Sequence, residues 1–392
     1  MPRVSVIIPC FNAGSYLEEA IQSILDQTYS SFEILIVNDG STDNTPDVVA
    51  RFNDQRIRYF YQQNKGLSAA RNAGILVSDG EYIAFLDADD WFVPSKLEVQ
   101  TRFLDMYADV GCVASGWVDT DERGDALRIV EPWHWKPDMG LAECVLGVPL
   151  VPHCVLVRRV WLEAVGLFDE GLRYREDWDL WLKLAAAGCK IVWLPELVCR
   201  YRVRANSLAH NWQGMRDGGQ AALDKIFSRP DLPDEVRLLR PQAYAALHID
   251  AAVRAYGAQD FHAGYLEIAQ AIKLRPDLLE GKPCTVVQSL VAWMDNPLVG
   301  NQDEYLDTLG RNLPPEVPSA RRQVRWAVSS RYMDKAFSAY QQDDYTYTLA
   351  WLRRSVWLDP RWLRNRGVLS IGVRALTCPK RRVRSLDKDS NG

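Results

Sequence analysis

The stretch Tyr82-Ile83-Ala84-Phe85-Leu86-Asp87-Ala88-Asp89-Asp90 joins an apolar run to three carboxylates. A short apolar run of this kind predicts a strand that is buried within a sheet. Carboxylates crowded at the end of such a strand raise one another's pKa unless a cation or several donors neutralise them. Hard cations such as Mg2+ or Mn2+ do so, because they prefer oxygen ligands and often also bind substrate phosphates. The stretch therefore predicts a buried strand that ends in a site for metal-assisted phosphate chemistry.

The chain on either side of this stretch alternates short β-branched runs with helical patterns as far as about residue 193. Helices are expected at 15–27, from near Pro94 onward, and at 178–187. Strands are expected at 4–8, 32–37, 57–61, 82–86, 110–115, 154–157 and 191–194. Strands that alternate with helices predict an α/β fold with a mostly parallel sheet sandwiched by helices.

The chain changes character after residue 212, where strand patterns stop and long helical stretches begin. In that region Ala255-Tyr256, Asp260-Phe261 and Leu274-Arg275-Pro276 return as Ala339-Tyr340, Asp344-Tyr345 and Leu358-Asp359-Pro360. This recurrence resembles tetratricopeptide-type helical hairpins, although the two copies lie further apart than that family's period of about 34 residues. The alternative is two unrelated helix pairs. We therefore expect an α/β domain at 1–212, an all-α domain at 213–379 and a polar tail at 380–392.

The composition narrows the class of protein. The chain has 392 residues and a net charge of −5, so it lacks the basic footprint of a general nucleic-acid-binding protein. Its eight cysteines are scattered, with no zinc-site spacing, which favours a reducing, cytoplasmic location. The sequence has no leader pattern, and no run approaches the roughly 20 apolar residues of a membrane span. We expect at most a peripheral membrane contact.

Three of the predicted strands end in residues suited to binding a nucleotide. Ligands of open α/β sheets bind beyond the carboxyl ends of the strands. The first strand leads into Pro9-Cys10-Phe11-Asn12, the second into Asn38-Asp39-Gly40, and the fourth into the acidic cluster. Phe11 can stack on a planar base and Asp39 can accept a hydrogen bond from a ring N–H, although Asp39-Gly40 is also typical of a plain turn. The glycine-rich motifs of dinucleotide-binding and kinase sites are absent.

Two further motifs carry charge. Arg71 lies in a helix of small residues and can neutralise phosphate oxygens; the alternative is an ordinary surface arginine. Glu176-Asp177 precedes an apolar helix, where a carboxylate can stabilise the helix start. The other interpretation is a general base that deprotonates an acceptor hydroxyl, and one carboxylate can do both.

Five motifs, taken in order, resemble family-two glycosyltransferases over roughly residues 1–210. They are Val4-Ser5-Val6-Ile7-Ile8-Pro9 with Phe11-Asn12, Asn38-Asp39-Gly40-Ser41-Thr42-Asp43, Ala70-Arg71-Asn72-Ala73-Gly74, residues 85–90, and Glu176-Asp177-Trp178. The resemblance implies the glycosyltransferase-A fold and an inverting transfer that depends on Mg2+ or Mn2+. The donor would be a nucleotide-diphosphate sugar, and the first candidate is a UDP-sugar. The acceptor would be a hydroxyl of a glycan, a lipid-linked or another molecule, in polysaccharide or glycoconjugate synthesis.

The resemblance also implies a role for each matching residue. Phe11 would stack on the base beside Pro9 and Asn12, and Asp39 would read the ring N–H. Arg71 would face the nucleotide and Asp87 the ribose. Asp89 would bind the metal, whereas Asp90 would support the turn into the next helix. Asp177 would be the base, with Glu176 beside it.

The sequence departs from the family pattern near Tyr201-Arg202. Many relatives place a histidine shortly afterwards, where it can join the metal site, but this chain has Arg204. An arginine cannot ligate a metal, so either Arg204 contacts the diphosphate or His210 takes the histidine's place. His153 is more typical of a strand residue with satisfied hydrogen bonds than of a catalyst. Trp133 and Trp135 suit either sugar stacking or loop packing.

Two other functions compete with a sugar transferase. A helical-repeat interaction protein could carry an inactive transferase domain and bind a protein partner through its helices. The presence of Asp87, Asp89, Arg71 and Asp177 argues against that function. A nucleotidyltransferase would usually have a basic, glycine-rich loop after its first strand, whereas Cys10-Phe11-Asn12-Ala13-Gly14 contains no basic residue.

Overall fold

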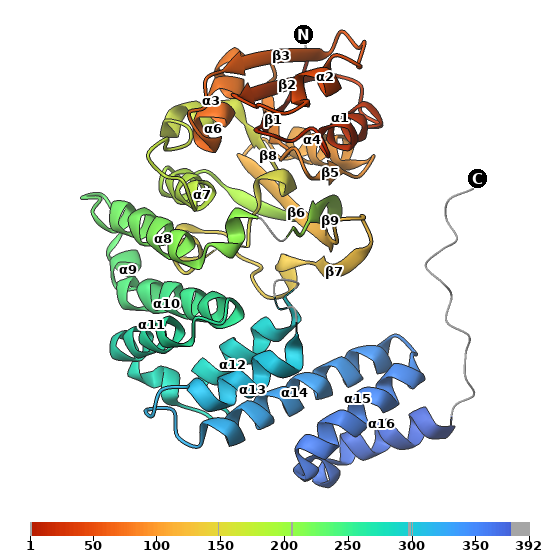
Figure 1. The fold of residues 1–392 in the computed structure, drawn as a ribbon, viewed down its shortest axis with the longest axis vertical. Helices are drawn as coiled ribbons and strands as arrows, with labels where there is room; N and C mark the ends of the chain where they lie inside the picture. Colours follow the sequence, from red (N-terminus) through yellow and green to blue (C-terminus); the bar gives the residue numbers. More distant parts are fainter. Residues whose placement is uncertain (1, 148, 205–206, 297–298, 300, 378–392) are drawn as a thin grey trace. The chain divides into compact units, whose positions relative to one another are not determined.

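The structure is a computed structural model that describes residues 2–147, 149–204, 207–296, 299 and 301–377 (Figure 1). The chain forms two compact units that meet in the sequence at Ala251 and Ala252. The first unit contains the sheet, and the second is helical. The expected tail at 380–392 lies outside the described residues.

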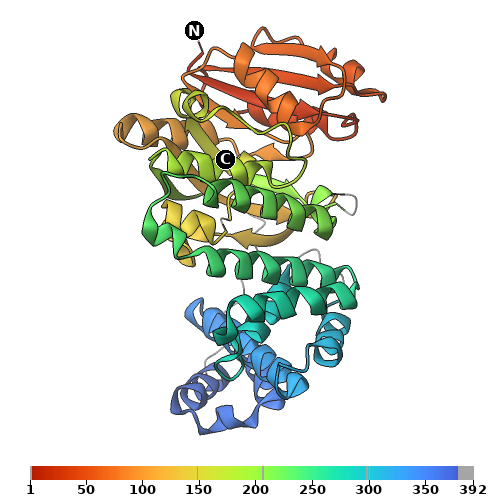
Figure 2. The same ribbon diagram turned by 90° about the vertical axis from the view of Figure 1, so that its left-hand side faces the viewer.

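A nine-stranded sheet forms the centre of the first unit (Figures 1 and 2). Its strand order is β3-β2-β1-β4-β8-β6-β9-β5, and β7 pairs with β6. The strands are β1 (Val4–Cys10), β2 (Phe32–Asp39), β3 (Ile57–Gln62), β4 (Tyr82–Phe85), β5 (Trp91–Phe92), β6 (Cys112–Thr120), β7 (Ala126–Val130), β8 (Val155–Arg158) and β9 (Ile191–Arg202).

The sheet is parallel from β3 to β4 and mixed beyond it. Strand β8 enters antiparallel to both β4 and β6, while β6 and β9 are parallel to each other. The predicted α/β class is confirmed, with parallel pairings among the first four strands in the order and between β6 and β9, and antiparallel pairings elsewhere. Two strands escaped prediction because β5 has two residues and β7 exposes the apolar side chains of Leu127 and Ile129.

The register of the central strands brings the predicted loops to one edge. Val4 of β1 pairs with Phe32 of β2 and with Tyr82 of β4. All residues of these three strands are buried, as expected of strands covered on both faces. The loops after β1, β2 and β4 therefore emerge together.

Helices cover this sheet and extend the first unit. Helix α3 packs on β1 and β2, and α4 packs on β6 and β9. The small residues of α3 have a steric reason, because a Cβ on Gly74 would lie 2.5 Å from Ile7 Cγ2. The helices are α1 (Leu17–Leu25), α2 (Thr45–Val49), α3 (Leu67–Val77), α4 (Lys96–Met106), α5 (Leu141–Val145), α6 (Arg159–Val165), α7 (Glu176–Ala186), α8 (Trp212–Phe227), α9 (Asp234–Arg237) and α10 (Arg240–Gly257).

The first unit continues past the boundary expected at residue 212. Helix α8 begins at Trp212 and packs against α7, with Trp178 and Leu182 sharing a hydrophobic cluster with Leu223 and Ile226. The two units divide later, within α10. The limits of the functional domains stay a prediction.

The second unit repeats one type of helical hairpin. Its further helices are α11 (Phe261–Leu274), α12 (Thr285–Ala292), α13 (Gln302–Asn312), α14 (Ala320–Gln341), α15 (Tyr345–Leu358) and α16 (Arg366–Thr377). The turns before α11 and α15 use left-handed residues, Gln259 (φ 62°) and Asp343 (φ 58°). Asp260 and Asp344 then cap the following helices through the N–H groups of Ala263 and Tyr347. The two copies seen in the sequence thus share one type of turn and one aspartate cap. None of the described helices has the length and hydrophobicity required to cross a bilayer.

Candidate active site

The loops after β1 and β2 are joined by hydrogen bonds that centre on Asn12. Asn12 Oδ1 accepts from the Thr42 N–H (2.8 Å), and the Asn12 N–H donates to Ser41 Oγ (2.9 Å). Asn12 has a positive φ of 50°, a conformation that asparagine tolerates better than most residues. Pro9 is buried in β1, whereas Phe11 is 52% exposed. Asn12 therefore shapes the loop, and the ring of Phe11 is accessible for stacking.

Asp39 lies at the end of β2 with most of its hydrogen-bonding capacity in use. Oδ1 accepts from Gln62 Nε2 (2.7 Å) and the Lys65 N–H (2.8 Å), and Oδ2 accepts from the Gly66 N–H (2.8 Å). Gly66 immediately precedes α3, so Asp39 fixes the start of that helix. A carboxylate offers about four acceptor positions, which leaves one on Oδ2 for a ligand.

Arg71 is at the centre of a buried network. Its side chain is 1% exposed, which excludes the surface-arginine alternative. Nη1 donates to Glu176 Oε1 (2.8 Å) and Nη2 donates to Asp87 Oδ1 (2.7 Å), so Arg71 connects the end of β4 to the first turn of α7. We expected paired donors aimed at phosphate oxygens. Both terminal nitrogens instead contact carboxylates, those of buried Glu176 and partly buried Asp87, which stabilise the buried cation.

The same network controls the charge of Asp87. Burial opposes ionisation of this carboxyl, but Arg71 outweighs burial, with help from His153 and Arg204. The pKa of Asp87 therefore lies below its usual value. Asp87 is an anion held in place by Arg71.

Glu176 and Asp177 occupy the first turn of α7 but have different partners. Glu176 is buried against Arg71, and Asp177 is half-buried, with Oδ1 accepting from the Trp178 N–H (2.7 Å). Among the residues that the structure describes, none forms an ion pair with Asp177. Burial raises the pKa of Glu176 to about 7 although Arg71 opposes it. Burial also raises the pKa of Asp177, against the opposing charges of Arg175 and Arg71.

The three carboxylates of the acidic cluster point to different partners. Asp89 Oδ2 lies 2.8 Å from Arg204 Nε, and the Arg204 guanidinium lies 5.1 Å from the centre of the Tyr16 ring. Burial and the neighbouring Asp90 charge raise the pKa of Asp89 to about 7, with Arg204 opposing. Arg204 is therefore the counter-ion of Asp89, the predicted metal ligand. His210 is exposed, and its Nε2 lies 3.0 Å from the Arg204 carbonyl oxygen.

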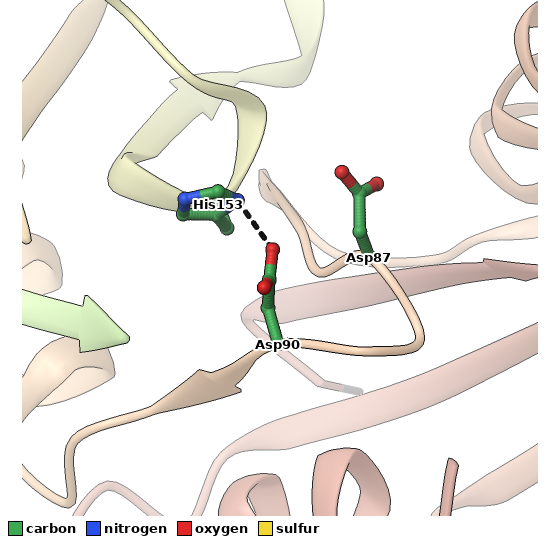
Figure 3. A group of neighbouring side chains, drawn as sticks. All are labelled: Asp87, Asp90 and His153. Carbon is green, nitrogen blue, oxygen red and sulfur yellow. Dashed lines mark ion pairs between the residues drawn. The ribbon is translucent and has the colours of Figure 1, made fainter. Parts of the chain in front are cut away.

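Asp90 is buried beside His153 (Figure 3). His153 lies in the short 3-10 helix Pro152–Cys154, just before β8, with its Nδ1 3.0 Å from Asp90 Oδ2. The imidazole also stacks on the Tyr201 ring, with centroids 5.3 Å apart. Asp90 Oδ1 accepts from the Arg202 N–H (2.7 Å), so this residue ties its loop to β9 rather than only supporting the next helix.

The contact between His153 and Asp90 is close but not aligned as a hydrogen bond. Within the described part of the chain, Asp90 Oδ2 and both ring nitrogens of His153 lack a hydrogen-bond partner. The expectation of a satisfied strand histidine is therefore wrong. Burial opposes protonation of His153, but Asp90 outweighs it and raises the pKa of the imidazole. A buried pair with unsatisfied atoms has a deficit of hydrogen bonds that a bound group can correct.

One atom from each of Asp87, Asp90 and His153 lies within 4.8 Å of the others (Figure 3). Two carboxylates and an imidazole are a donor set used by divalent cations, and the unsatisfied atoms are available to serve as ligands. These residues therefore fit a divalent metal ion. The sequence could not reveal the contribution of His153, because only the antiparallel entry of β8 beside β4 brings it to Asp90.

The two loop tryptophans have separate environments. Trp133 packs against Trp193, with ring centroids 6.5 Å apart. Trp135 is 60% exposed. Loop packing therefore accounts for Trp133, and only Trp135 keeps an accessible indole.

Comparisons with known proteins identify the family of this chain. The model of glycosyl transferase family 2 matches residues 5–166. An uncharacterized glycosyltransferase of Rickettsia typhi is 37% identical over 191 residues, covering 46% of this chain and 58% of that protein. TuaG of Bacillus subtilis, named a putative teichuronic acid biosynthesis glycosyltransferase, is 32% identical over 222 residues, 55% of this chain and 85% of TuaG. The chain belongs to glycosyl transferase family 2.

Solved structures with this fold are more distant in sequence. The crystal structure of S. aureus TarS 1–349 has a TM-score of 0.51 at 17% identity and covers 91% of each chain. The mannosyltransferase PcManGT from Pyrobaculum calidifontis has a TM-score of 0.53 at 19% identity, over 79% of this chain and 87% of PcManGT. These likenesses show the fold, and they bear out the glycosyltransferase-A architecture. The match to this chain spans 58% of the length of the R. typhi relative. It spans 31% of the length of a relative from Rickettsia felis and 65% of one from Rickettsia prowazekii.

Proposed function

We propose that this family-two protein transfers a sugar, with inversion, from a nucleotide-diphosphate sugar to an acceptor hydroxyl in polysaccharide or glycoconjugate synthesis. The observation that carries the proposal is the asymmetry around Arg71. Arg71 neutralises Asp87 and Glu176 and leaves Asp177 as the carboxylate without an ion-pair partner in the described chain. Family membership supports the same reaction class, and TuaG is named for teichuronic acid biosynthesis.

The donor would bind along the loops after β1, β2 and β4. Phe11 would stack on the base, with Pro9 and Asn12 shaping the loop beneath it. Asp39 would accept the ring N–H at its remaining position, and Asp87 would face the ribose. Uridine is the proposed base because TarS, which shares the fold, was crystallised with UDP, although PcManGT was crystallised with GDP-Man and Mn2+.

Mg2+ or Mn2+ is the proposed cofactor. Asp87, Asp90 and His153 would hold the ion, and Asp89 would join them if Arg204 turned to the diphosphate. When bound, the ion supplies positive charge next to the leaving diphosphate.

The protein's own residues would accept the acceptor's proton and hold the reacting groups in position. The acceptor oxygen forms a bond to the anomeric carbon while the bond from that carbon to the diphosphate oxygen breaks, and the diphosphate keeps the electron pair. Asp177 takes the acceptor proton as the new bond forms. Its raised pKa makes it a stronger base than an ordinary aspartate, and Glu176 stays paired with Arg71. Arg204 would face the departing negative charge. One displacement inverts the carbon and needs no covalent sugar–enzyme intermediate.

The test is Asp177→Asn, read as sugar release from UDP-sugars and as binding of UDP with Mn2+ by calorimetry. We expect unchanged binding and a loss of turnover of about 100- to 10,000-fold, because general-base catalysis contributes that much. Asp217→Asn, at an exposed carboxylate on α8, is the matched control and should behave as the parent protein. Full turnover in Asp177→Asn would remove the base assignment. A parent protein that binds no nucleotide sugar would favour the interaction protein with an inactive transferase domain.

A further inference from the structure

Directly before the two carboxylates of α7, the chain adopts an unusual backbone conformation. Arg175 precedes α7 with a φ of 59° and a ψ of 22°, in the left-handed region. A residue other than glycine costs free energy there, so it persists only where surrounding contacts fix it. Tyr174 supplies one such contact with α8, because a Cβ on Gly214 would lie 2.5 Å from Tyr174 Cε2. The start of α7 is therefore fixed in part by a helix that follows the sheet.

The side chain of Arg175 contacts a second helix that follows the sheet, α10. Arg175 Nη2 donates to Asp250 Oδ2, and the guanidinium carbon lies 5.7 Å from the centre of the Trp178 ring. The Arg175 side chain is 19% exposed, so this ion pair is partly shielded from water. Shielding strengthens an ion pair relative to one on the open surface. Asp250 therefore holds the guanidinium that precedes the proposed base.

Charged groups from several elements act on Asp177. They are Arg71 of α3, Asp87 after β4, and Arg175 and Glu176 at the start of α7. The other carboxylate in the first turn of α7, Asp179, faces Lys183 and Lys225 instead. Two cations therefore act on Asp177, and they come from opposite ends of the described first unit.

Of the two arginines, Arg175 has the stronger effect on Asp177. Burial raises the pKa of Asp177, and Arg175 opposes that rise more than Arg71 does. Among the residues that the structure describes, however, Arg175 forms its ion pair with Asp250 and not with Asp177. The charge state of Asp177 therefore depends on where the Arg175 guanidinium is held.

We propose that Asp250 is a positioning residue that holds the Arg175 guanidinium and thereby keeps the Asp177 carboxylate free to accept the acceptor proton. A carboxylate paired with an arginine takes up a proton less readily, because protonation destroys a favourable charge pair. Without Asp250, the guanidinium would turn to Asp177. Helix α10 thus acts on the reaction through Arg175, and the inference rests on the proposed role of Asp177 as the base.

The experiment follows the titration of Asp177 by carbon-13 NMR on the full chain, labelled at the aspartate carboxyl carbons. The Asp177 signal is assigned by its loss in Asp177→Asn. Neither a sugar donor nor a metal is added, so the titration tests Asp250 by itself. Turnover of Asp177→Asn tests the base role separately, and the two failures are therefore distinguishable.

The two partners of the ion pair should have opposite effects. Asp250→Asn should lower the midpoint of the Asp177 titration by about 1 pH unit or more, because the freed arginine pairs with Asp177. Arg175→Gln should raise the midpoint, because the stronger of the two opposing charges is removed. In the double variant, most of the effect of Asp250→Asn should disappear, because no guanidinium is left to turn. The acid limb of turnover with UDP-sugars should move in the same directions.

Two further variants serve as controls. Asp250→Glu keeps the charge and should restore the parent titration. Asp231→Asn breaks the exposed ion pair with Arg229 and should leave the titration of Asp177 unchanged. Circular dichroism checks that each variant is folded, and Arg175→Gln tests the proposal even if Asp250→Asn does not fold.

Three results would overturn the proposal. The first is a titration of Asp177 that Asp250→Asn and Arg175→Gln both leave unchanged. The second is a change of the same sign in both variants, as a general loosening of the turn would produce. The third is an effect of Asp250→Asn that persists in full when Arg175 is also replaced, because Asp250 would then act without the arginine.

Discussion

Two buried charge clusters at the same edge of the sheet differ in how completely they are satisfied. Around Arg71, both terminal nitrogens donate to carboxylates, and only Nε lacks a partner in the described chain. In the Asp90–His153 pair, the facing oxygen and both imidazole nitrogens lack hydrogen bonds. Burial of charge is costly in either case. The Arg71 cluster is therefore largely satisfied within the described protein, whereas the Asp90–His153 pair leaves atoms for the proposed metal ion.

The largest effect on stability should come from breaking the Arg71 cluster. Arg71→Met leaves buried Glu176 and partly buried Asp87 without this counter-ion, and we expect a loss of about 3–5 kcal/mol in the free energy of unfolding. Urea denaturation measures it. Arg51→Met is the control, because Arg51 forms an exposed ion pair with Glu18 and should change stability by at most about 1 kcal/mol. Equal effects of the two variants would mean that the Arg71 network does not stabilise the fold.

The Asp90–His153 pair should show its main effect in metal binding. His153→Gln also removes the imidazole whose Nδ1 lies 3.0 Å from buried Asp90 Oδ2, so we expect a loss of about 1–3 kcal/mol in stability as well. It should lower Mn2+ affinity by at least about tenfold, because even outer-shell partners of metal sites contribute about 10- to 100-fold. Calorimetry with Mn2+ and UDP measures the Mn2+ affinity of His153→Gln. The same measurement on Asp89→Asn tests the other predicted metal ligand.

The exposed His134 supplies the control for that experiment as His134→Gln. If the Mn2+ affinity is unchanged in His153→Gln but falls in Asp89→Asn, then Asp89 is the metal ligand and His153 is not.

The pH dependence should separate the proposed catalytic base, Asp177, from Asp87. The pKa of Asp177 is raised above its usual value, so turnover should fall by up to about tenfold per pH unit once the pH drops below that raised pKa. Stability should move the other way. The folded state holds more protons than the unfolded state between the ordinary pKa of Glu176, 4.5, and about 7, so these groups destabilise the fold as pH rises through that window.

Asp87 has a lowered pKa, so its contribution to stability is present at neutral pH and is lost only in acid, as pH falls through that lowered value. Turnover profiles and urea denaturation over the same pH range check both signs. A turnover that begins to fall only near the ordinary aspartate pKa of 3.8 would contradict the assignment of the base.

The smallest effect concerns Asn12, which joins the loops after β1 and β2 by hydrogen bonds. Asn12→Ala removes the hydrogen bond from Thr42 and places alanine at a φ of 50°, so we expect a loss of about 1 kcal/mol in stability and of a few fold in UDP affinity. Asn12→Gly keeps the backbone conformation and should recover the stability lost to backbone strain. Thermal unfolding with and without UDP measures both. If Asn12→Gly proves no more stable than Asn12→Ala, backbone strain is not the cause.

Local patterns predicted the parts of the fold that depend on neighbouring residues. The apolar runs that became β1, β2 and β4 were recognisable because strands buried on both faces contain almost no polar residues. The hairpin turns before α11 and α15 were visible because each needs an aspartate cap at a fixed place. Strands β5 and β7 were missed, since a two-residue strand and an exposed alternating one have weak patterns.

The sequence by itself determined the edge at which the site forms. Strand ends that carry Phe11, Asp39 and Asp87 must meet in a parallel sheet, and the spacing of the motifs does not depend on distant contacts. The tertiary structure alone decided which charges became partners. Arg71 reaches Glu176 across 105 positions of sequence, and His153 reaches Asp90 through the antiparallel entry of β8. Pairing in a desolvated interior depends on ångström-scale proximity, which no local pattern contains.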